Sequence, residues 1–171
     1  MALDVETGTG SAIAESYLSV VDAAAYHLKM GNRDAWALVG NEGAKEAMLR
    51  RATNYLRDRY YDMWLGDMAV STQRLDWPRN GVWTRGGNGL ASTIVPEEVK
   101  DACAELALRA SSAALMPDTS QGIKREKIGP IEVEYDQYSP STAAFASIDA
   151  MLAPYLVSGA QPGLNVPLMR S

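Results

Sequence analysis

Residues 42–66, EGAKEAMLRRATNYLRDRYYDMWLG, carry the strongest helical pattern in the chain. Their apolar and aromatic side chains recur at spacings of three and four residues, which places them on one face of an α-helix. These side chains are Leu49, Ala52, Leu56, Tyr60 and Met63. Asn41 precedes the pattern as an N-cap, and Gly66 follows it as a stop. We therefore expect one long amphipathic helix within a mainly α fold.

Two further helices flank this stretch. Upstream, Ser19 and Asp22 form a capping box at the start of a short helix that ends near Gly31. Downstream, Pro96 and the two glutamates after it suit the first turn of a helix that runs until Pro117. Its apolar stripe consists of Val99, Ala102, Cys103, Leu106, Ala110 and Ala113. Because alanine-rich faces let helices approach closely, we expect this to be the central core helix.

The strongest β signal lies within residues 122–136, in the run IKREKIGPIEVEYD. Gly129 and Pro130 separate two alternating segments, which is typical of a two-residue β-hairpin turn. The predicted register pairs Ile128 with Ile131, Lys127 with Glu132, Arg125 with Glu134 and Lys124 with Tyr135. An isolated two-stranded ribbon is marginal in water, so this protruding hairpin should need a partner surface.

These elements divide the chain into three parts. Residues 1–18 are rich in Gly, Thr and Ser and are expected to form an extended N-terminal arm. Residues 19–157 form a small helical bundle with the hairpin, closed by a helix over residues 142–157 whose last turns Pro154 bends. Residues 158–171 have no helical period but contain apolar side chains. They are read either as a tail that docks on a neighbour or as a disordered end.

Composition limits the possible functions. The formal net charge of −5 argues against a general nucleic-acid binder, although the stretch from Arg50 to Arg85 has a local excess of three positive charges. The single cysteine, Cys103, excludes an intramolecular disulfide and fits a buried position in a protein made in a reducing compartment. With His27 as the only histidine, no metal site or nucleophile–base pair can be assembled. We therefore expect no enzymatic activity, metal or cofactor, and no apolar run is long enough for a membrane span.

The segment TQRLDWPRNGVWTRGGNG, residues 72–89, is the most unusual part of the chain. Trp77 and Trp83 lie among Arg74, Arg79 and Arg85 where no helical period is present. Such side chains can stack on bases and hold phosphates, as in single-strand binders. Alternatively, the tryptophans pack under the loop while the arginines meet acids of an adjoining subunit. The acidic total charge favours the second interpretation.

The order of these features resembles the head–tail connector (adaptor) proteins of tailed bacteriophages. The resemblance covers residues 20–156 and is carried by the ordered set KEAMLRRATNYLRDRYYDMWLG, TQRLDWPRNGV, VPEEVKDACAELALRA, GIKREKIGPIEVEYD and IDAMLAPYL. Phage sequences of this kind are also commonly labelled DnaT-like single-stranded-DNA-binding proteins. That label provides the alternative function, in which Trp77, Trp83 and the nearby arginines bind single-stranded DNA.

The connector resemblance implies a structural protein of the virion neck, made in the host cytoplasm. Copies would form a ring of about twelve subunits between the portal protein and a stopper or tail-completion protein. Double-stranded genome DNA would pass through the ring without sequence-specific binding. The interface residues would be Arg74, Trp77, Arg79, Trp83, Lys124, Arg125, Lys127, Glu132 and Glu134. The tail would dock on the portal through Leu164, Val166, Pro167, Leu168, Met169 and Arg170.

Overall fold

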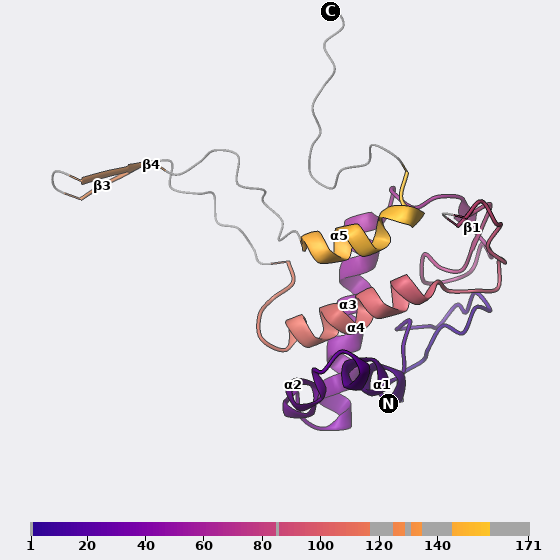
Figure 1. Cartoon of the computed structure of the whole chain (residues 1–171), viewed down its shortest axis with the longest axis horizontal. Helices are drawn as coiled ribbons and strands as arrows, with labels where there is room; N and C mark the ends of the chain where they lie inside the picture. The colour runs from indigo at the N-terminus through magenta and orange to yellow at the C-terminus, as the bar shows by residue number, and fades with distance from the viewer. Residues whose placement is uncertain (1, 85, 117–124, 129–130, 135–144, 158–171) are drawn as a thin grey trace, which may run out of the picture.

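The structure, a computed structural model, describes residues 2–84, 86–116, 125–128, 131–134 and 145–157 (Figure 1). The helices are α1 (Val20–Lys29), α2 (Arg33–Leu38), α3 (Glu42–Tyr60), α4 (Glu97–Ala110) and α5 (Ala146–Leu152), followed by the 3-10 turn η1 (Ala153–Tyr155). The strands are β1 (Asp67–Met68), β2 (Arg79–Asn80), β3 (Arg125–Ile128) and β4 (Ile131–Glu134). β1 pairs with β2 and β3 pairs with β4, both antiparallel. This confirms the predicted mainly α fold with a β-hairpin.

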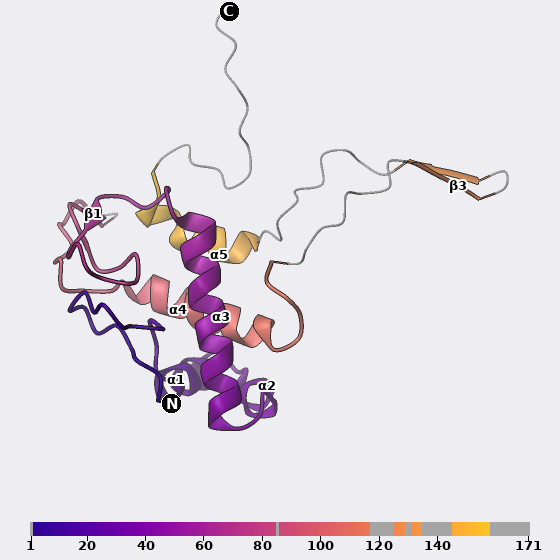
Figure 2. The ribbon, with the colours of Figure 1, turned by 180° about the vertical axis from the view of Figure 1, so that it is seen from behind.

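The core forms where α3 and α4 cross. Seen from both sides, α3 runs from the end of the body that holds α1 and α2 toward α5 (Figures 1 and 2). The side chains buried at the crossing include Leu49, Ala52 and Leu56 from α3, and Val99, Ala102, Cys103 and Leu106 from α4. The Cys103 Sγ lies 3.4 Å from the Thr53 Oγ1, and burial raises the pKa of this thiol. The prediction that Cys103 is a buried residue of a central helix is confirmed.

The predicted helix starts are confirmed at α1 and α3. The Ser19 Oγ accepts a hydrogen bond from the Asp22 backbone N–H at 3.1 Å and donates to the Asp22 carboxylate at 2.6 Å. The Asn41 Oδ1 accepts from the backbone N–H of Ala44 at 3.0 Å. Each cap satisfies a backbone donor that has no partner inside its helix, so both helices begin where the sequence indicates.

The end of α3 differs from the prediction. The helix ends at Tyr60, and Gly66 is not its stop. Gly66 has φ +68°, and a Cβ added there would lie 2.0 Å from the backbone oxygen of Asn80. Glycine is therefore required because the chain turns back against β2, a long-range contact that no local pattern reveals. Helix α4 likewise ends at Ala110, before the expected Pro117.

The N-terminal segment does not reach away from the body as an arm. Residues 2–18 form no helix, but Ala14, Tyr17 and Leu18 are buried in the hydrophobic core. The buried Glu6 carboxylate accepts hydrogen bonds from the backbone N–H groups of Gly8, Gly10 and Ser11 at 2.7, 3.0 and 2.7 Å. The expectation of an extended arm is corrected, because the many backbone donors of a Gly/Thr/Ser-rich stretch are satisfied here by one carboxylate.

The β3–β4 hairpin has the predicted register. The backbone pairs Arg125 with Glu134, Lys127 with Glu132 and Ile128 with Ile131. The expected pair of Lys124 and Tyr135 lies outside the described residues, as do Arg85 and the whole predicted docking tail, residues 158–171. In the described part of the predicted final helix, Ile148 and Leu152 are buried, and Pro154 lies within η1, where the α-helical hydrogen bonding has ended. None of the described helices is long and apolar enough to cross a membrane.

Candidate nucleic-acid interface

The segment between α3 and α4 folds first onto its own core. Trp77 is fully buried, with its ring edge-on to those of Trp64 and Tyr155 at centroid distances of 5.6 Å each. The short β1–β2 ladder joins the two ends of the loop that carries Trp77, by pairing Asp67 with Asn80 and Met68 with Arg79. A base cannot stack on Trp77 without removing it from the core. The interpretation that the tryptophans pack under the loop is therefore correct for Trp77 and wrong for Trp83, which is exposed.

Arg79 is also directed inward, into the turn that follows α3. Its guanidinium donates to the carbonyl oxygens of Leu65 at 2.8 Å, Gly66 at 2.6 Å and Asp76 at 3.1 Å. Burial lowers the pKa of Arg79, while the nearby Asp76 raises it. Because its donors are used on main-chain carbonyls, this arginine holds the loop together and is not available to a phosphate.

Asp76 lies beside this arginine and completes the inner part of the loop. Its carboxylate accepts a hydrogen bond from the Trp64 indole N–H at 3.2 Å. Burial raises the pKa of Asp76 to about 6, and the bond from Trp64 counteracts part of that rise. Gln73 contributes a further tie, because its amide donates to the carbonyls of Leu75 and Pro78 at 2.7 and 3.0 Å. The side chains of Asp76 and Gln73 therefore stabilise the loop from inside through these hydrogen bonds.

The second half of the segment carries the exposed aromatic side chain. Residues 82–84 and 86–90 pair as a tight hairpin, in which the Leu90 N–H donates to the Val82 carbonyl and the Thr84 N–H to the Asn88 carbonyl, both at 2.8 Å. Trp83 lies on this hairpin with 62% of its surface exposed. Gly89 lies opposite, and a Cβ added there would be 3.8 Å from the Trp83 ring, an ordinary van der Waals contact. This side chain has the exposure that base stacking requires.

The predicted interface residues are thus not brought together on one surface. Trp77 and Arg79 are buried, whereas Trp83 and Arg74 are exposed. The Arg74 guanidinium lies 3.4 Å from the carbonyl of Ile13 and 3.9 Å from the Glu15 carboxylate. Of the hairpin residues, the structure describes only the backbone pairing given above. The docking-tail residues lie outside the described chain.

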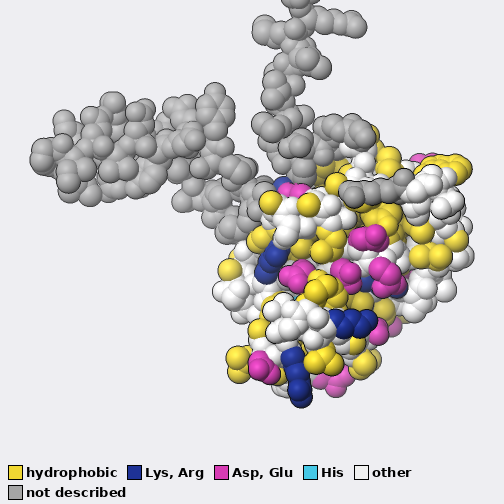
Figure 3. Space-filling view, viewed as in Figure 1, with side chains coloured by type: hydrophobic (Ala, Val, Ile, Leu, Met, Phe, Trp, Pro, Cys, Tyr) yellow, Lys and Arg dark blue, Asp and Glu magenta, His cyan; other side chains and the backbone are white. Residues whose placement is uncertain are grey.

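Most basic side chains near the predicted interface are already paired with acids. In the described part of the chain, carboxylates lie within 4.0 Å of Arg50, Arg57, Arg59, Arg74, Lys100 and Arg109. On the face seen in Figure 3, acidic and basic side chains are interspersed and form no continuous basic patch. Any phosphate contact would therefore have to compete with an existing ion pair at most of these positions.

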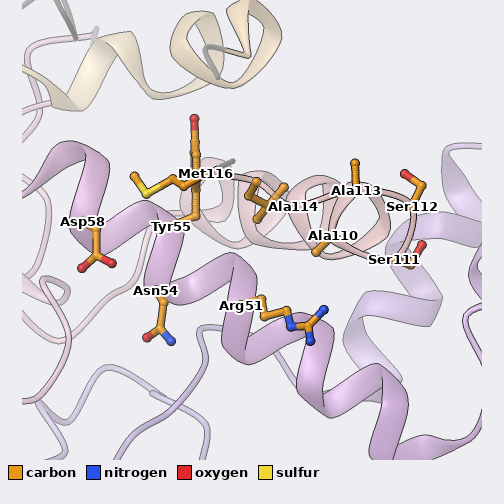
Figure 4. A pocket seen from close by; sticks show the side chains of 11 residues that line it. Arg51, Asn54, Tyr55, Asp58, Ala110, Ser111, Ser112, Ala113, Ala114 and Met116 are labelled. Carbon is orange, nitrogen blue, oxygen red and sulfur yellow. The ribbon is translucent and has the colours of Figure 1, made fainter. Parts of the chain in front are cut away.

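Two hollows lie at opposite ends of α4. One, of about 590 Å³, is walled by Arg51, Asn54, Tyr55 and Asp58 of α3 and by residues 110–116 (Figure 4). The other, of about 440 Å³, lies beside the exposed hairpin and is lined by Thr84, Gly86, Glu98, Ala150, Met151, Pro154 and Tyr155. Arg51 is exposed, and its side chain contacts the sulfur of Met48 at 4.0 Å. Arg51 was not predicted to line a hollow, although Asn54 and Asp58 follow it at spacings of three and four that place the three polar side chains on one side of the helix.

Among the described residues, potential metal ligands do not cluster, and His27 is packed inside the body. No three or more His, Cys, Asp or Glu side chains gather to hold a metal ion in the part of the chain that the structure describes. His27 is buried against α2, with its ring stacked on Trp36 at 4.9 Å and its Nε2 3.2 Å from the Ala104 carbonyl. His27 is therefore a packed helix residue.

Comparison with known proteins gives a match over the full length of the chain. A family model with the description "Putative DnaT-like ssDNA binding protein" matches residues 1–171. No curated protein and no solved structure gives a significant match.

Proposed function

The chain belongs to the family of DnaT-like ssDNA-binding proteins, and on that premise we propose that it binds single-stranded DNA through the Trp83 hairpin. The observation that carries this proposal is the exposure of Trp83, whose side chain lies on a glycine-rich turn with most of its surface in solvent. A base can stack on such a ring whatever its identity, so binding of this kind tolerates any sequence.

The surroundings of Trp83 support one stacking site rather than a long binding groove. The hollow beside the hairpin has apolar walls from Met151 and Pro154, which suit a second base or the sugar next to it. Glu98 on the same wall opposes a phosphate. Because the nearby cations are largely paired with acids, we expect affinity in about the micromolar range or weaker, with a shallow dependence on salt.

Intrinsic fluorescence offers a direct test. The other tryptophans, Trp36, Trp64 and Trp77, are buried, so quenching by an unlabelled oligothymidylate should report on Trp83 alone. Loss of one stacked base costs about 1–3 kcal/mol, so Trp83→Ala should weaken binding roughly 5- to 150-fold in an anisotropy titration with labelled oligothymidylate. Trp83→Phe, which keeps an aromatic face, should recover part of that loss.

Tyr61→Ala is the matched control, because Tyr61 is an equally exposed aromatic residue just after α3. Its affinity should equal that of the wild type. Unquenched fluorescence at saturating oligonucleotide, or equal weakening by both alanine variants, would remove Trp83 from the binding site. No binding at all at low salt would count against the proposed function itself.

A second candidate is the structural role in the virion neck, as a head–tail connector subunit. The acidic net charge favours it, because negative charge repels the phosphate backbone of DNA that passes through a ring. The apolar outer face of α1, where Val21 and Leu28 are exposed, also favours it as a surface for assembly. In this role the protein would assemble with portal and stopper proteins and would need no DNA-binding residue.

Co-sedimentation with purified portal rings separates the two candidates. The connector function expects the full chain to bind the portal and a chain lacking residues 158–171 to lose that attachment while keeping its helical circular dichroism. Oligothymidylate binding should survive the same truncation if Trp83 carries it. If the full chain does not co-sediment with the portal rings, the connector function is eliminated.

A further inference from the structure

Helix α1 presents an apolar stripe to solvent as well as to the core. Ala23, Tyr26 and His27 face inward and are buried. On the opposite side Val21, Ala24, Ala25 and Leu28 are exposed, at the spacings of three, four and seven residues that align side chains along one helix face. The exposed fractions of Val21 and Leu28 are 75% and 60%. A helix that is apolar on both sides is normally covered on both sides.

The stripe matches an antiparallel copy of itself. When two such helices run in opposite directions about a twofold axis, Val21 of one lies against Leu28 of the other, and Ala24 lies against Ala25. The two alanines at the centre allow the helix axes to approach closely, while the larger side chains fill the ends. A surface that pairs with itself in this way forms an isologous, twofold interface.

Charge at the edge of the stripe selects the same arrangement. Asp22 in the first turn and Lys29 in the last turn lie on one flank of α1, seven residues apart. In an antiparallel pair like flanks meet, so Asp22 of each copy faces Lys29 of the other. A parallel pair would instead set this flank against the side of α1 that is buried in its own subunit. The helix dipoles also oppose each other in the antiparallel pair.

We propose that the exposed face of α1 binds a second copy of this chain, antiparallel and about a twofold axis. Helix α2, whose last residue Leu38 is 86% exposed, lies at the same end of the body as α1 (Figure 1). A ten-residue helix covers much less than the roughly 800 Å² per partner of a standard interface, so the dimer is weak and depends on concentration. This inference does not rest on DNA binding or on a virion role.

Sedimentation velocity of the full chain from about 1 to 500 µM tests the proposal. A monomer–dimer equilibrium is expected, and Leu28→Lys should raise its dissociation constant at least about tenfold. Ile13→Lys is the control, because Ile13 is 63% exposed but belongs to the N-terminal segment. Lys29→Glu should also weaken the dimer, and adding Asp22→Lys should restore it. A monomer at every concentration, or association that survives Leu28→Lys, would overturn the proposal.

Cross-linking tests the geometry separately. An Ala25→Cys substitution places a thiol next to the twofold axis, whereas Ala150→Cys places one on exposed α5. The native Cys103 is fully buried, so the introduced thiol is the reactive one. Oxidation should join Ala25→Cys chains into disulfide dimers much faster than Ala150→Cys chains. Equal rates would exclude the α1 pairing. They are the result expected if the chain associates through another surface, because the Ala25→Cys thiols would then not be brought together.

Discussion

Arg79→Met is the perturbation that most directly tests whether the loop arginine is structural. The substitution keeps most of the side-chain volume but removes three hydrogen bonds, to the carbonyls of Leu65, Gly66 and Asp76. Hydrogen bonds from charged groups contribute about 1.5–3 kcal/mol each, and part of this sum is offset by the cost of burying the guanidinium. Because the substitution also leaves the buried Asp76 carbonyl and two partly buried carbonyls without these donors, we expect a loss of about 3–5 kcal/mol in the free energy of unfolding.

The assay is urea unfolding followed by circular dichroism, with thermal melts as a second measurement. For a chain of this size, a loss of that magnitude lowers Tm by about 6–20 °C. Arg74→Met is the matched control, since Arg74 is exposed and makes one long hydrogen bond and one ion pair of 3.9 Å. Its effect should stay within about 0.5 kcal/mol.

A difference of less than about 1 kcal/mol between the free energies of unfolding of the two variants would refute the structural role of Arg79. A folded Arg79→Met chain that loses oligothymidylate binding at unchanged stability would be a second contradiction, because it would place the guanidinium in a DNA site instead of inside the loop.

Further predictions concern buried charged and titratable groups. Glu6→Gln should lower the free energy of unfolding by about 1–3 kcal/mol, because one carboxylate oxygen that accepts from a backbone N–H is replaced by an amide nitrogen that cannot accept. An unchanged Tm in thermal unfolding would contradict this. The pKa of Asp76 is raised to about 6 in the folded chain, so its proton is held more tightly there than in the unfolded chain. The contribution of Asp76 to the free energy of unfolding therefore grows as pH falls from about 7 to 4. Asp76→Asn keeps an acceptor for the Trp64 indole, so this variant should be more stable than the wild type at pH 7 and should not gain stability from Asp76 protonation at lower pH. Parallel curves of unfolding free energy against pH for the two proteins, measured in urea, would refute this prediction. Burial lowers the pKa of His27, so its contribution is present above pH 6.5 and is lost as pH falls below that value. The stability difference between wild type and His27→Phe should therefore shrink from pH 7 to pH 5, and a constant difference would show that the ring is protonated while folded.

Local patterns predicted the elements that local interactions stabilise. The N-caps Ser19 and Asn41 bond to backbone groups three residues away, so their signal lies within one turn of chain. The register of β3 and β4 was predictable for the same reason, because a two-residue turn determines every pair. Helix α2 was missed: it has six residues and no side-chain cap bond, and it is stabilised by burial of Trp36 against His27.

The candidate site was predicted only as a set of residue types. Trp77 and Trp83 lie six positions apart in one segment, with Pro78 directly after the first and Gly81 two positions before the second. One is fully buried and the other largely exposed, because Trp64 and Tyr155 provide a pocket of rings for the first only. Trp64 comes from the segment after α3 and Tyr155 from η1, 13 residues before and 78 residues after Trp77 in the chain. No pattern near either tryptophan contains that information.

The amino-acid sequence by itself determined where the long helices begin, which face of α4 is apolar and how the β3–β4 ribbon is paired. These features depend on contacts within a few residues, whose geometry the backbone imposes. Only the tertiary structure decided that residues 2–18 pack onto the body, that Arg79 is enclosed and Trp83 exposed, and that α1 is left with an uncovered apolar side. Burial depends on what distant segments place over a side chain, and that is settled when the helices and loops pack together.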